Sequence, residues 1–335
     1  MDKPYRKPLT PDEPYPSLET FGELDRDYFF GRNDEIAELV QLVQSAPLVL
    51  LYGKSGYGKS SLLQAGVFPQ LRESGYIPIL IRFQFEISIS LSDQVLTQIA
   101  QAVTSGALDA PLPILSTASP KPTQSLEGEV LAPDSLWEYC YRASFWTPDG
   151  EPAVPVLVFD QFEEVFTRGS QRRGELERLV AELSDVIQGR IPERARPRIQ
   201  RGEINIEHVR AGAPVRVLLA QREDYLVQLL ALSPHLRTLD VTANSLHLGA
   251  LSFGAATDAA RKPGLARSLV TPAIAVEIAA RAAGLESPPP VDKQADTWVE
   301  PAFWAFFALD STKREFKKTN PQLIWQSSTA APATL

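Results

Sequence analysis

One run in the sequence combines glycines, a lysine and a serine at a spacing suited to binding phosphate groups. It fits the pattern G-x-x-x-x-G-K-[ST] at every fixed position, and it reads Gly53-Lys54-Ser55-Gly56-Tyr57-Gly58-Lys59-Ser60. Glycines let the backbone curl so that successive N–H groups point inward at phosphate oxygens. Lys59 supplies a full charge to the β- and γ-phosphates, and the Ser60 hydroxyl is placed to ligate magnesium. The run therefore predicts a loop that binds a purine nucleoside triphosphate with Mg²⁺.

Carboxylates follow another apolar run. A magnesium site of this kind needs a carboxylate at the tip of a neighbouring strand, and the apolar run 154–159 ends in Asp160. We therefore assign Asp160 as the direct or water-mediated magnesium ligand. Either Glu163 or Glu164 is the candidate to orient and deprotonate an attacking water. The alternative for these two glutamates is solvated charge at a helix N-terminus, which the helix macrodipole favours.

An arginine follows a third apolar run. Arg222 comes just beyond residues 214–220. In an open α/β sheet, ligands lie beyond the carboxyl ends of the strands. The guanidinium is therefore predicted to reach the γ-phosphate and to report its presence. The alternative is an ion pair with Glu223, Asp224 or another nearby acid.

The elements that must position these residues alternate between strands and helices. Short apolar runs, typical of strands buried on both faces of a parallel sheet, occur at 47–52, 77–81, 154–159 and 214–220, with a fifth candidate at 245–248. Apolar residues at helical spacing predict helices at 33–43, 59–71, 92–103 and 176–187. Asp134 and Ser135 are predicted to cap a short aromatic helix that ends near Trp146. The fold class is therefore α/β, with helices only after residue 255.

Changes in amino-acid composition along the chain predict the boundaries of further segments. Residues 1–20 carry five prolines and are predicted to form an extended arm. The α/β domain spans 21–252, with a loop insertion at 105–133 that is rich in Pro, Ser, Thr and Ala. A helical region at 253–325 and a frayed tail at 326–335 follow. The arginine-rich stretch 190–201 is predicted to be a solvated connector.

The net charge, the apolar runs and the numbers of cysteines and histidines argue against several kinds of binding surface and metal site. The formal net charge of −8 over 335 residues argues against a general nucleic-acid or anionic-membrane surface. No apolar run approaches the roughly 18 residues of a membrane helix, and no signal-peptide pattern is present. A single cysteine, Cys140, fits a reducing compartment, and three separated histidines argue against a zinc site. We therefore expect a soluble cytoplasmic protein.

Together these motifs resemble the STAND class of signal-transducing P-loop ATPases, and specifically the bacterial group called novel STAND NTPase 1. The resemblance covers roughly residues 15–325. Its most discriminating segments are Asp160-Gln161-Phe162-Glu163-Glu164 and Arg222-Glu223-Asp224-Tyr225. Further matching segments are Tyr15-Pro16-Ser17-Leu18, Phe29-Phe30-Gly31-Arg32, the continuation of the loop from Ser61 to Pro69, and Leu136-Trp137-Glu138-Tyr139.

The resemblance carries specific implications. It implies a parallel five-stranded sheet flanked by helices, then a helical lid and the start of a winged-helix-like region. It implies nucleotide contacts from Gly53 to Ser61, with Gly31 and Arg32 near the adenine and ribose, and Arg222 as the sensor arginine. It also implies a switch that is ADP-bound and closed at rest, and ATP-bound and open on activation. Opening would expose surfaces for self-association or for an effector or sensor protein.

Two functions stay open on the sequence. One is a slowly ATP-hydrolysing regulatory switch in signalling or defence, and the other is a nucleotide-binding scaffold with negligible turnover. Retention of Asp160, Glu163 and Glu164 favours slow hydrolysis. A metabolic kinase is disfavoured because nothing suggests a phosphoryl-acceptor pocket. Family members usually carry effector domains or WD40 or TPR repeats, and these residues contain neither.

Overall fold

A computed structural model describes residues 7–16, 19–104, 135–143, 145–204, 215–232 and 243–301. The chain divides into two compact units. The first, here called the sheet unit, comprises 21–23 and 33–249. The second, the helical unit, comprises 1–20, 24–32 and the chain from residue 250 onward. The predicted insertion at 105–133 and tail at 326–335 lie outside the described residues.

The sheet unit is built on a parallel sheet whose spatial order is β2-β3-β4-β1-β5. Its strands are β1 (Leu48–Gly53), β2 (Tyr76–Ile81), β3 (Val154–Phe159), β4 (Arg216–Arg222) and β5 (Ser245–His247). All neighbouring pairs run parallel. Nearly every residue of β1, β3 and β4 is buried, which explains why these strands read as unbroken apolar runs. The predicted α/β fold with a five-stranded parallel sheet is confirmed.

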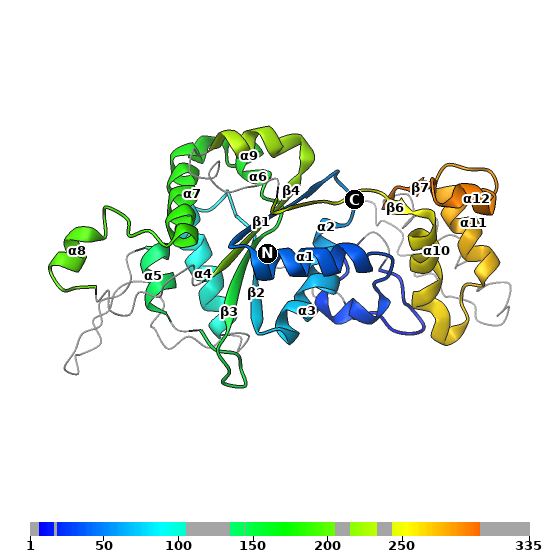
Figure 1. Cartoon of the computed structure of the whole chain (residues 1–335), viewed down its shortest axis with the longest axis horizontal. Helices are drawn as coiled ribbons and strands as arrows, with labels where there is room; N and C mark the ends of the chain where they lie inside the picture. The colour runs from blue at the N-terminus through cyan, green and yellow to red at the C-terminus, as the bar shows by residue number, and fades with distance from the viewer. Residues whose placement is uncertain are drawn as a thin grey trace, which may run out of the picture. The chain divides into compact units, whose positions relative to one another are not determined.

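Helices cover both faces of this sheet, with α4, α5 and α7 on one side and α1 and α3 on the other (Figure 1). The α-helices of the unit are α1 (Asn33–Ser45), α2 (Lys59–Ser61), α3 (Phe68–Glu73), α4 (Leu91–Thr104), α5 (Leu136–Arg142), α6 (Glu164–Thr167), α7 (Arg173–Gln188), α8 (Arg196–Gln200) and α9 (Leu226–Leu232). Short 3₁₀ turns of the unit are η3 (Ser170–Arg172) and η5 (Glu223–Tyr225), whereas η1 (Glu23–Tyr28) falls mostly in the helical unit. The core between the sheet and α4, α5 and α7 includes Leu96, Tyr139, Leu157 and Leu179.

The helix predicted over 59–71 is divided by a π-helical segment, η2 (Leu62–Val67). Its wider turn is visible where the Phe68 N–H donates to the Leu63 carbonyl, five residues earlier. Pro69 explains the interruption, because it has no N–H and its ring would clash with the carbonyl four residues back in a regular α-helix. The helix nevertheless continues in one direction into α3.

The aromatic helix α5 begins as predicted and ends early. The Ser135 hydroxyl accepts a hydrogen bond from the Glu138 N–H at 3.2 Å, so Ser135 is the N-cap. The helix ends at Arg142, and the prediction that it extends to near Trp146 is wrong. Trp146 instead forms an isolated antiparallel bridge with Pro152, which closes a tight turn at 147–151 before β3.

Most of residues 190–201 are exposed, as expected of the predicted solvated connector, but Arg198 departs from that prediction. Arg198 ion-pairs with Glu138, whose side chain is 0% exposed, and Arg194 pairs with Glu182 at 2.9 Å. A carboxylate taken out of water needs a counter-charge. The prediction is wrong for Arg198 because its partner Glu138 lies on α5, 60 residues away in sequence, whereas Arg194 stays 46% exposed.

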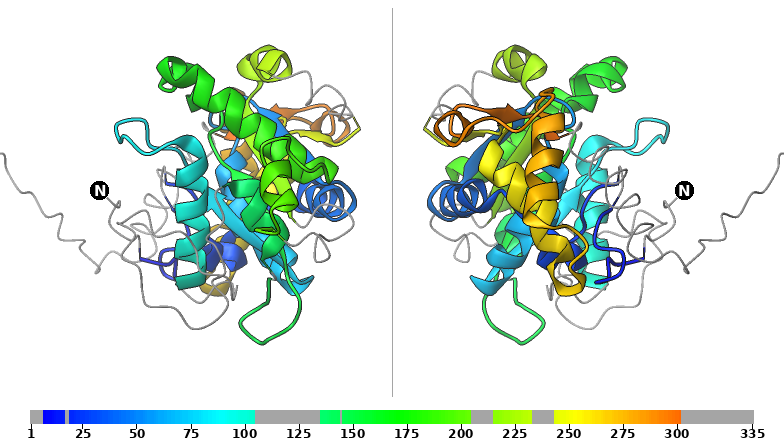
Figure 2. Two further views of the ribbon diagram at one scale, coloured as in Figure 1. Left: turned by 90° about the vertical axis from the view of Figure 1, so that its left-hand side faces the viewer. Right: turned by 90° about the vertical axis from the view of Figure 1, so that its right-hand side faces the viewer.

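The helical unit packs α10 (Phe253–Arg261) beside α11 (Pro272–Ala282), shown in yellow and orange in the right-hand view of Figure 2. Small buried side chains, among them Ala256, Ala260, Ala275 and Ala279, leave room for this packing. The unit also contains η7 (Lys262–Arg267), α12 (Val291–Gln294) and an antiparallel pair of β6 (Leu251–Ser252) and β7 (Trp298–Val299). The prediction of helices alone missed this pair, because two-residue strands leave no periodic pattern. Among the described residues, no helix is long and apolar enough to cross a membrane.

The Glu138–Arg198 pair gives a test of the core. Replacing Arg198 with Ala should lower the free energy of unfolding by about 3 kcal/mol, because it removes the guanidinium that offsets the charge of a buried carboxylate. Urea denaturation of the wild type and the variant measures this loss. Arg173→Ala, which removes an exposed arginine paired with Glu177, is the control and should change little. An equal, small effect of both substitutions would contradict a structural role for the buried pair.

Candidate phosphate- and metal-binding site

The predicted phosphate loop joins β1 to α2 and takes a shape that its glycines permit. Gly56 and Gly58 have φ values of 80° and 88°, in the left-handed region that side-chain-bearing residues rarely adopt. Gly53 is required for a different reason: a Cβ atom there would lie 2.4 Å from the carbonyl oxygen of Leu248, on the segment after β5. The sequence pattern therefore has a separate steric cause at each of its fixed glycines.

The loop presents hydrogen-bond donors. Within the described part of the chain, the N–H groups of Ser55, Gly56 and Gly58 donate to no other group. Those of Lys59 and Ser60 open α2 and have no acceptor inside the helix. Successive amides of this kind, at a helix N-terminus, form a concave site that attracts anions.

Lys59 adds a positive charge to the same loop. Its Nζ atom donates to the carbonyl oxygens of Gly53 at 2.8 Å and Lys54 at 3.0 Å, so the side chain folds back over the loop. Burial lowers the pKa of Lys59, while the negative charges of Glu163 and Asp160 oppose that shift. A partly desolvated ammonium group gains most from an added anion. The loop thus has the donors and the charge to hold phosphate oxygens.

Asp160 lies where the sequence predicts it, beyond the end of β3 and against the loop. Its carboxylate accepts hydrogen bonds from the Ser60 hydroxyl, at 3.0 Å to Oδ1 and 2.9 Å to Oδ2. The Gln161 N–H donates to Oδ1 at 3.1 Å. The structure therefore brings together the two residues predicted as metal ligands. A hydroxyl and a carboxylate are oxygen donors, which hard divalent cations such as Mg²⁺ prefer, so the residues present fit that ion.

Arg82 is a part of this site that the sequence analysis missed. It follows the last residue of β2, and its guanidinium forms an ion pair with Oδ2 of Asp160. The Asp160 side chain is 2% exposed, whereas that of Arg82 is 46% exposed. Its position after an apolar strand is the signal that could have identified Arg82, because ligands of open α/β sheets bind beyond the carboxyl ends of the strands.

The structure separates the two candidate glutamates. Glu163 faces the loop: its Oε2 atom accepts from the Arg222 N–H at 3.3 Å, and its charge acts directly on Lys59. Glu164 belongs to a different set of contacts, since it pairs with Arg168 at 3.1 Å and Arg168 also pairs with Glu86. Glu163 is therefore the one of the two that lies against the phosphate loop.

Arg222 ends β4, which lies between β1 and β3 and hence between the loop and Asp160. Its guanidinium ion-pairs with Asp224 and lies 5.7 Å from the centre of the Tyr225 ring. This is the ion pair that the sequence analysis gave as the alternative to a γ-phosphate contact. Arg222 still lies close enough to Lys59 for its charge to lower the pKa of that lysine.

Gly31 and Arg32 belong to the helical unit. Gly31 has a φ of 88°, and a Cβ atom there would lie 2.6 Å from the carbonyl oxygen of Ala255. Close packing against α10 therefore explains this glycine within its own unit. Arg32 is a buried side chain.

Comparison of the sequence with models of known protein families gives one match. A family model described as Novel STAND NTPase 1 matches residues 14–284, which is most of the chain. A comparison with curated proteins finds no match.

Several solved structures are similar to this chain at low identity. The Walker-type ATPase of Pyrococcus abyssi is 14% identical, with 91% of this chain and 76% of that chain covered and a TM-score of 0.42. The Orc1 protein of Aeropyrum pernix, solved in complex with DNA, is 14% identical, with coverages of 87% and 62% and a TM-score of 0.45. Cdc6p of Pyrobaculum aerophilum is 12% identical, with the same coverages and a TM-score of 0.46. This chain spans less than two thirds of the length of the last two.

The close approach at Gly53 can be tested by stability. Gly53→Ala should lower the free energy of unfolding by about 2 kcal/mol, because the added methyl group forces the loop and Leu248 apart. Gly174→Ala, inside α7 where a Cβ atom meets nothing within 4 Å, is the control and should be neutral or stabilising. Denaturant unfolding compares the two. A Gly53→Ala variant as stable as the wild type would contradict the steric account of the loop.

Proposed function

The chain belongs to the Novel STAND NTPase 1 family, and we propose that it is a regulatory switch that binds ATP and hydrolyses it slowly, in signalling or defence. One observation carries the proposal: a loop that carries Lys59, and in which the amides of Ser55, Gly56 and Gly58 donate to no group in the described part of the chain, lies against the Ser60–Asp160 pair. That arrangement offers a phosphate chain its donors and a metal ion its oxygen ligands in one place.

Binding of the phosphates is the first part of the proposal. The amides of Ser55, Gly56, Gly58, Lys59 and Ser60 would donate to the α- and β-phosphates, and Lys59 would exchange its two carbonyl acceptors for β- and γ-phosphate oxygens. Charge-assisted hydrogen bonds of this kind are stronger than the neutral bonds they replace. Ser61 would extend the same helix N-terminus, and Gly31 and Arg32 are proposed to lie near the adenine and ribose.

Magnesium is the second part. Ser60 and Asp160 would hold it, directly or through water, because their oxygens already lie within hydrogen-bond distance of each other. When bound there, Mg²⁺ would offset the negative charge of the β- and γ-phosphate oxygens.

Glu163 is proposed as the base for hydrolysis. Its carboxylate would accept a proton from a water molecule as the water oxygen attacks the γ-phosphorus, and the bond to the β-bridging oxygen would break to release ADP. The choice over Glu164 rests on position, since Glu163 contacts the end of β4 beside the loop whereas Glu164 is paired with Arg168. A general base must reach the proton that it removes.

The switch itself depends on Arg222 and on the helical unit. Arg222 would exchange Asp224 for the γ-phosphate, so its position would differ between the ADP-bound and the ATP-bound states. The helical unit would serve as a lid and the start of a winged-helix-like region, closed with ADP and open with ATP. Opening would expose a surface for self-association or for an effector or sensor protein. ATP need only prefer the open state by a few kcal/mol. A cytoplasmic location, favoured by the single buried cysteine, is part of the same proposal.

Nucleotide binding is tested with Lys59→Ala. Removing the ammonium group should weaken ATP binding about a hundred-fold or more, because a charged partner of the phosphates is lost. Isothermal titration calorimetry with ATP and Mg²⁺ measures the affinity, and Lys293→Ala, which removes an exposed lysine of α12 outside the loop, is the control and should leave it unchanged. Near-normal affinity in the Lys59→Ala variant would rule out this loop as the binding site.

Hydrolysis is tested by comparing Glu163→Gln with Glu164→Gln. The first should lower the rate of phosphate release about a hundred-fold, since it removes the proposed base, while the second should leave most of the rate. The reverse order would assign the base to Glu164 instead. Absence of phosphate release from the wild type would favour the alternative function, a nucleotide-binding scaffold with negligible turnover.

A further inference from the structure

Two side chains, those of Ser60 and Arg82, bind the carboxylate of Asp160. Its Oδ2 atom accepts from Ser60 at 2.9 Å and is also paired with the guanidinium of Arg82. A metal ion held by Ser60 and Asp160 would need the lone pairs that Arg82 now engages. It would also bring a double positive charge next to a guanidinium group, and like charges at such separation repel.

The backbone of Arg82 is held in place from α4. Gln98 acts as a substitute strand partner: its Oε1 atom accepts from the Arg82 N–H at 2.9 Å, and its Nε2 atom donates to the Arg82 carbonyl at 3.3 Å. Gln94, one helical turn earlier, does the same for Gln84, at 2.8 Å and 3.0 Å. The two glutamines thus fix alternate residues of the segment that follows β2.

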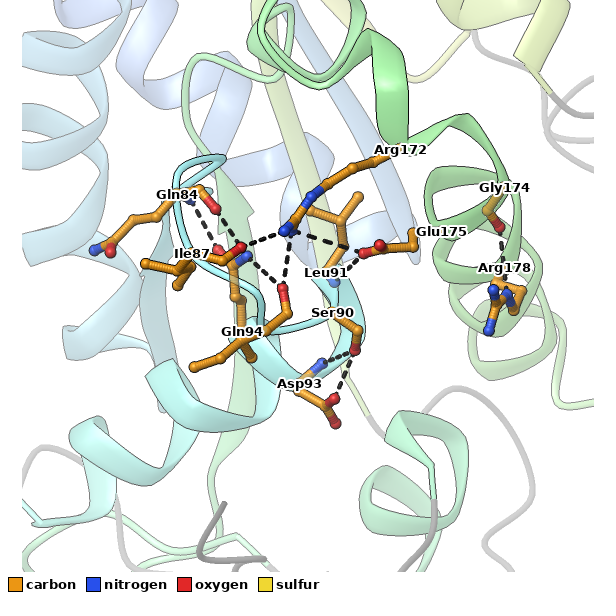
Figure 3. A network of polar contacts seen from close by, with 11 residues as sticks. Gln84, Ile87, Ser90, Leu91, Asp93, Gln94, Arg172, Gly174, Glu175 and Arg178 are labelled. Carbon is orange, nitrogen blue, oxygen red and sulfur yellow. Dashed lines mark hydrogen bonds and ion pairs between the residues drawn. The ribbon is translucent and has the colours of Figure 1, made fainter. Parts of the chain in front are cut away.

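The rest of this segment is also tied down (Figure 3). Arg172, at the end of η3, reaches across and donates to the carbonyl oxygens of Ile87 and, at 2.9 Å, Ile89. Glu175 accepts from the first N–H of α4, at Leu91, at 3.2 Å. The segment from 82 to 90 is therefore anchored to α4 and to Arg172 of η3, so we expect a change at Arg82 to involve its side chain rather than its backbone.

A fixed backbone with a half-exposed side chain suits a group that changes partner. The carboxylate of Asp160 is withdrawn from water and needs positive charge nearby, whereas the guanidinium of Arg82 is 46% exposed and loses little on leaving. We propose that Arg82 competes with magnesium for Asp160, an inference that rests on the proposed function. Arg82 stabilises the buried carboxylate when the metal is absent and withdraws from it when a metal–nucleotide complex binds. Competition from Arg82 therefore weakens Mg²⁺ binding at this site and makes it more dependent on bound nucleotide.

The test compares the wild type with Arg82→Gln, which keeps much of the side-chain length and removes the charge. ADP binding is measured by calorimetry at a series of Mg²⁺ concentrations, giving the Mg²⁺ concentration at half-maximal enhancement. Loss of the competitor should lower this concentration about five-fold, the effect expected of a partly exposed ion pair. Arg173→Gln, which removes an exposed arginine paired with Glu177, is the matched control and should leave it unchanged. Arg82→Lys, which retains the charge, should lie near the wild type.

A second readout does not depend on nucleotide affinity. The Tm of Arg82→Gln in EDTA without nucleotide should fall below that of the wild type, and the difference should close with Mg²⁺ and ADP. Gln98→Ala, which frees the Arg82 backbone, should shift both readouts in the same direction by a smaller amount, so it provides the test if Arg82→Gln does not fold.

Each other outcome overturns the inference. If Arg82→Gln leaves the Mg²⁺ concentration at half-maximal enhancement unchanged and lowers the Tm equally in EDTA and with Mg²⁺ and ADP, the Arg82–Asp160 pair has only a structural role. A higher Mg²⁺ concentration at half-maximal enhancement means that Arg82 assists the metal. In both cases ADP binding by the wild type leaves the proposed function standing. Absence of ADP binding by the wild type overturns the proposed function and the inference together.

Discussion

The site depends on a carboxylate held out of water at the edge of a parallel sheet. Asp160 is almost fully buried, and three donors converge on it: the Ser60 hydroxyl, the Gln161 amide and the guanidinium of Arg82. Each donor comes from a different position, since Ser60 opens the helix after β1, Gln161 follows β3 and Arg82 follows β2. A buried charge is tolerated only where such partners offset its desolvation. The placement of these three strands is thus what makes the carboxylate stable.

Strand order supplies that placement. Because β4 lies between β1 and β3, its end carries Arg222 into the space between the phosphate loop and Asp160. The turn after Asp160 is tied to the same strand, since the Phe162 N–H donates to the Ala220 carbonyl at 2.9 Å. Gln161 has a φ of 57°, and this left-handed residue turns the chain so that Glu163 meets the Arg222 amide. Fold and site are therefore set by the same hydrogen bonds.

Local features were predictable from the sequence and pairings across the fold were not. The strands could be predicted because burial on both faces leaves unbroken apolar runs, and the loop because its residue types follow a known phosphate-binding pattern, although the contact with Leu248 that requires Gly53 could not. Whether Glu163 or Glu164 faces the loop depends on one left-handed residue, which sequence does not reveal. Arg82 and Arg198 were missed for a common reason: each pairs with an acid that only the strand order or the helix packing brings near. The β6–β7 pair is too short to leave a pattern.

If the loop and Asp160 together form one nucleotide and metal site, a crystal structure of the protein grown with ADP and magnesium will show both ligands there. We expect the β-phosphate within hydrogen-bond distance of the amides of Gly56, Gly58, Lys59 and Ser60, and the metal ion between the Ser60 hydroxyl and the Asp160 carboxylate. Nucleotide bound elsewhere on the chain, with Ser60 and Asp160 still hydrogen-bonded to each other and the loop empty, would contradict this expectation.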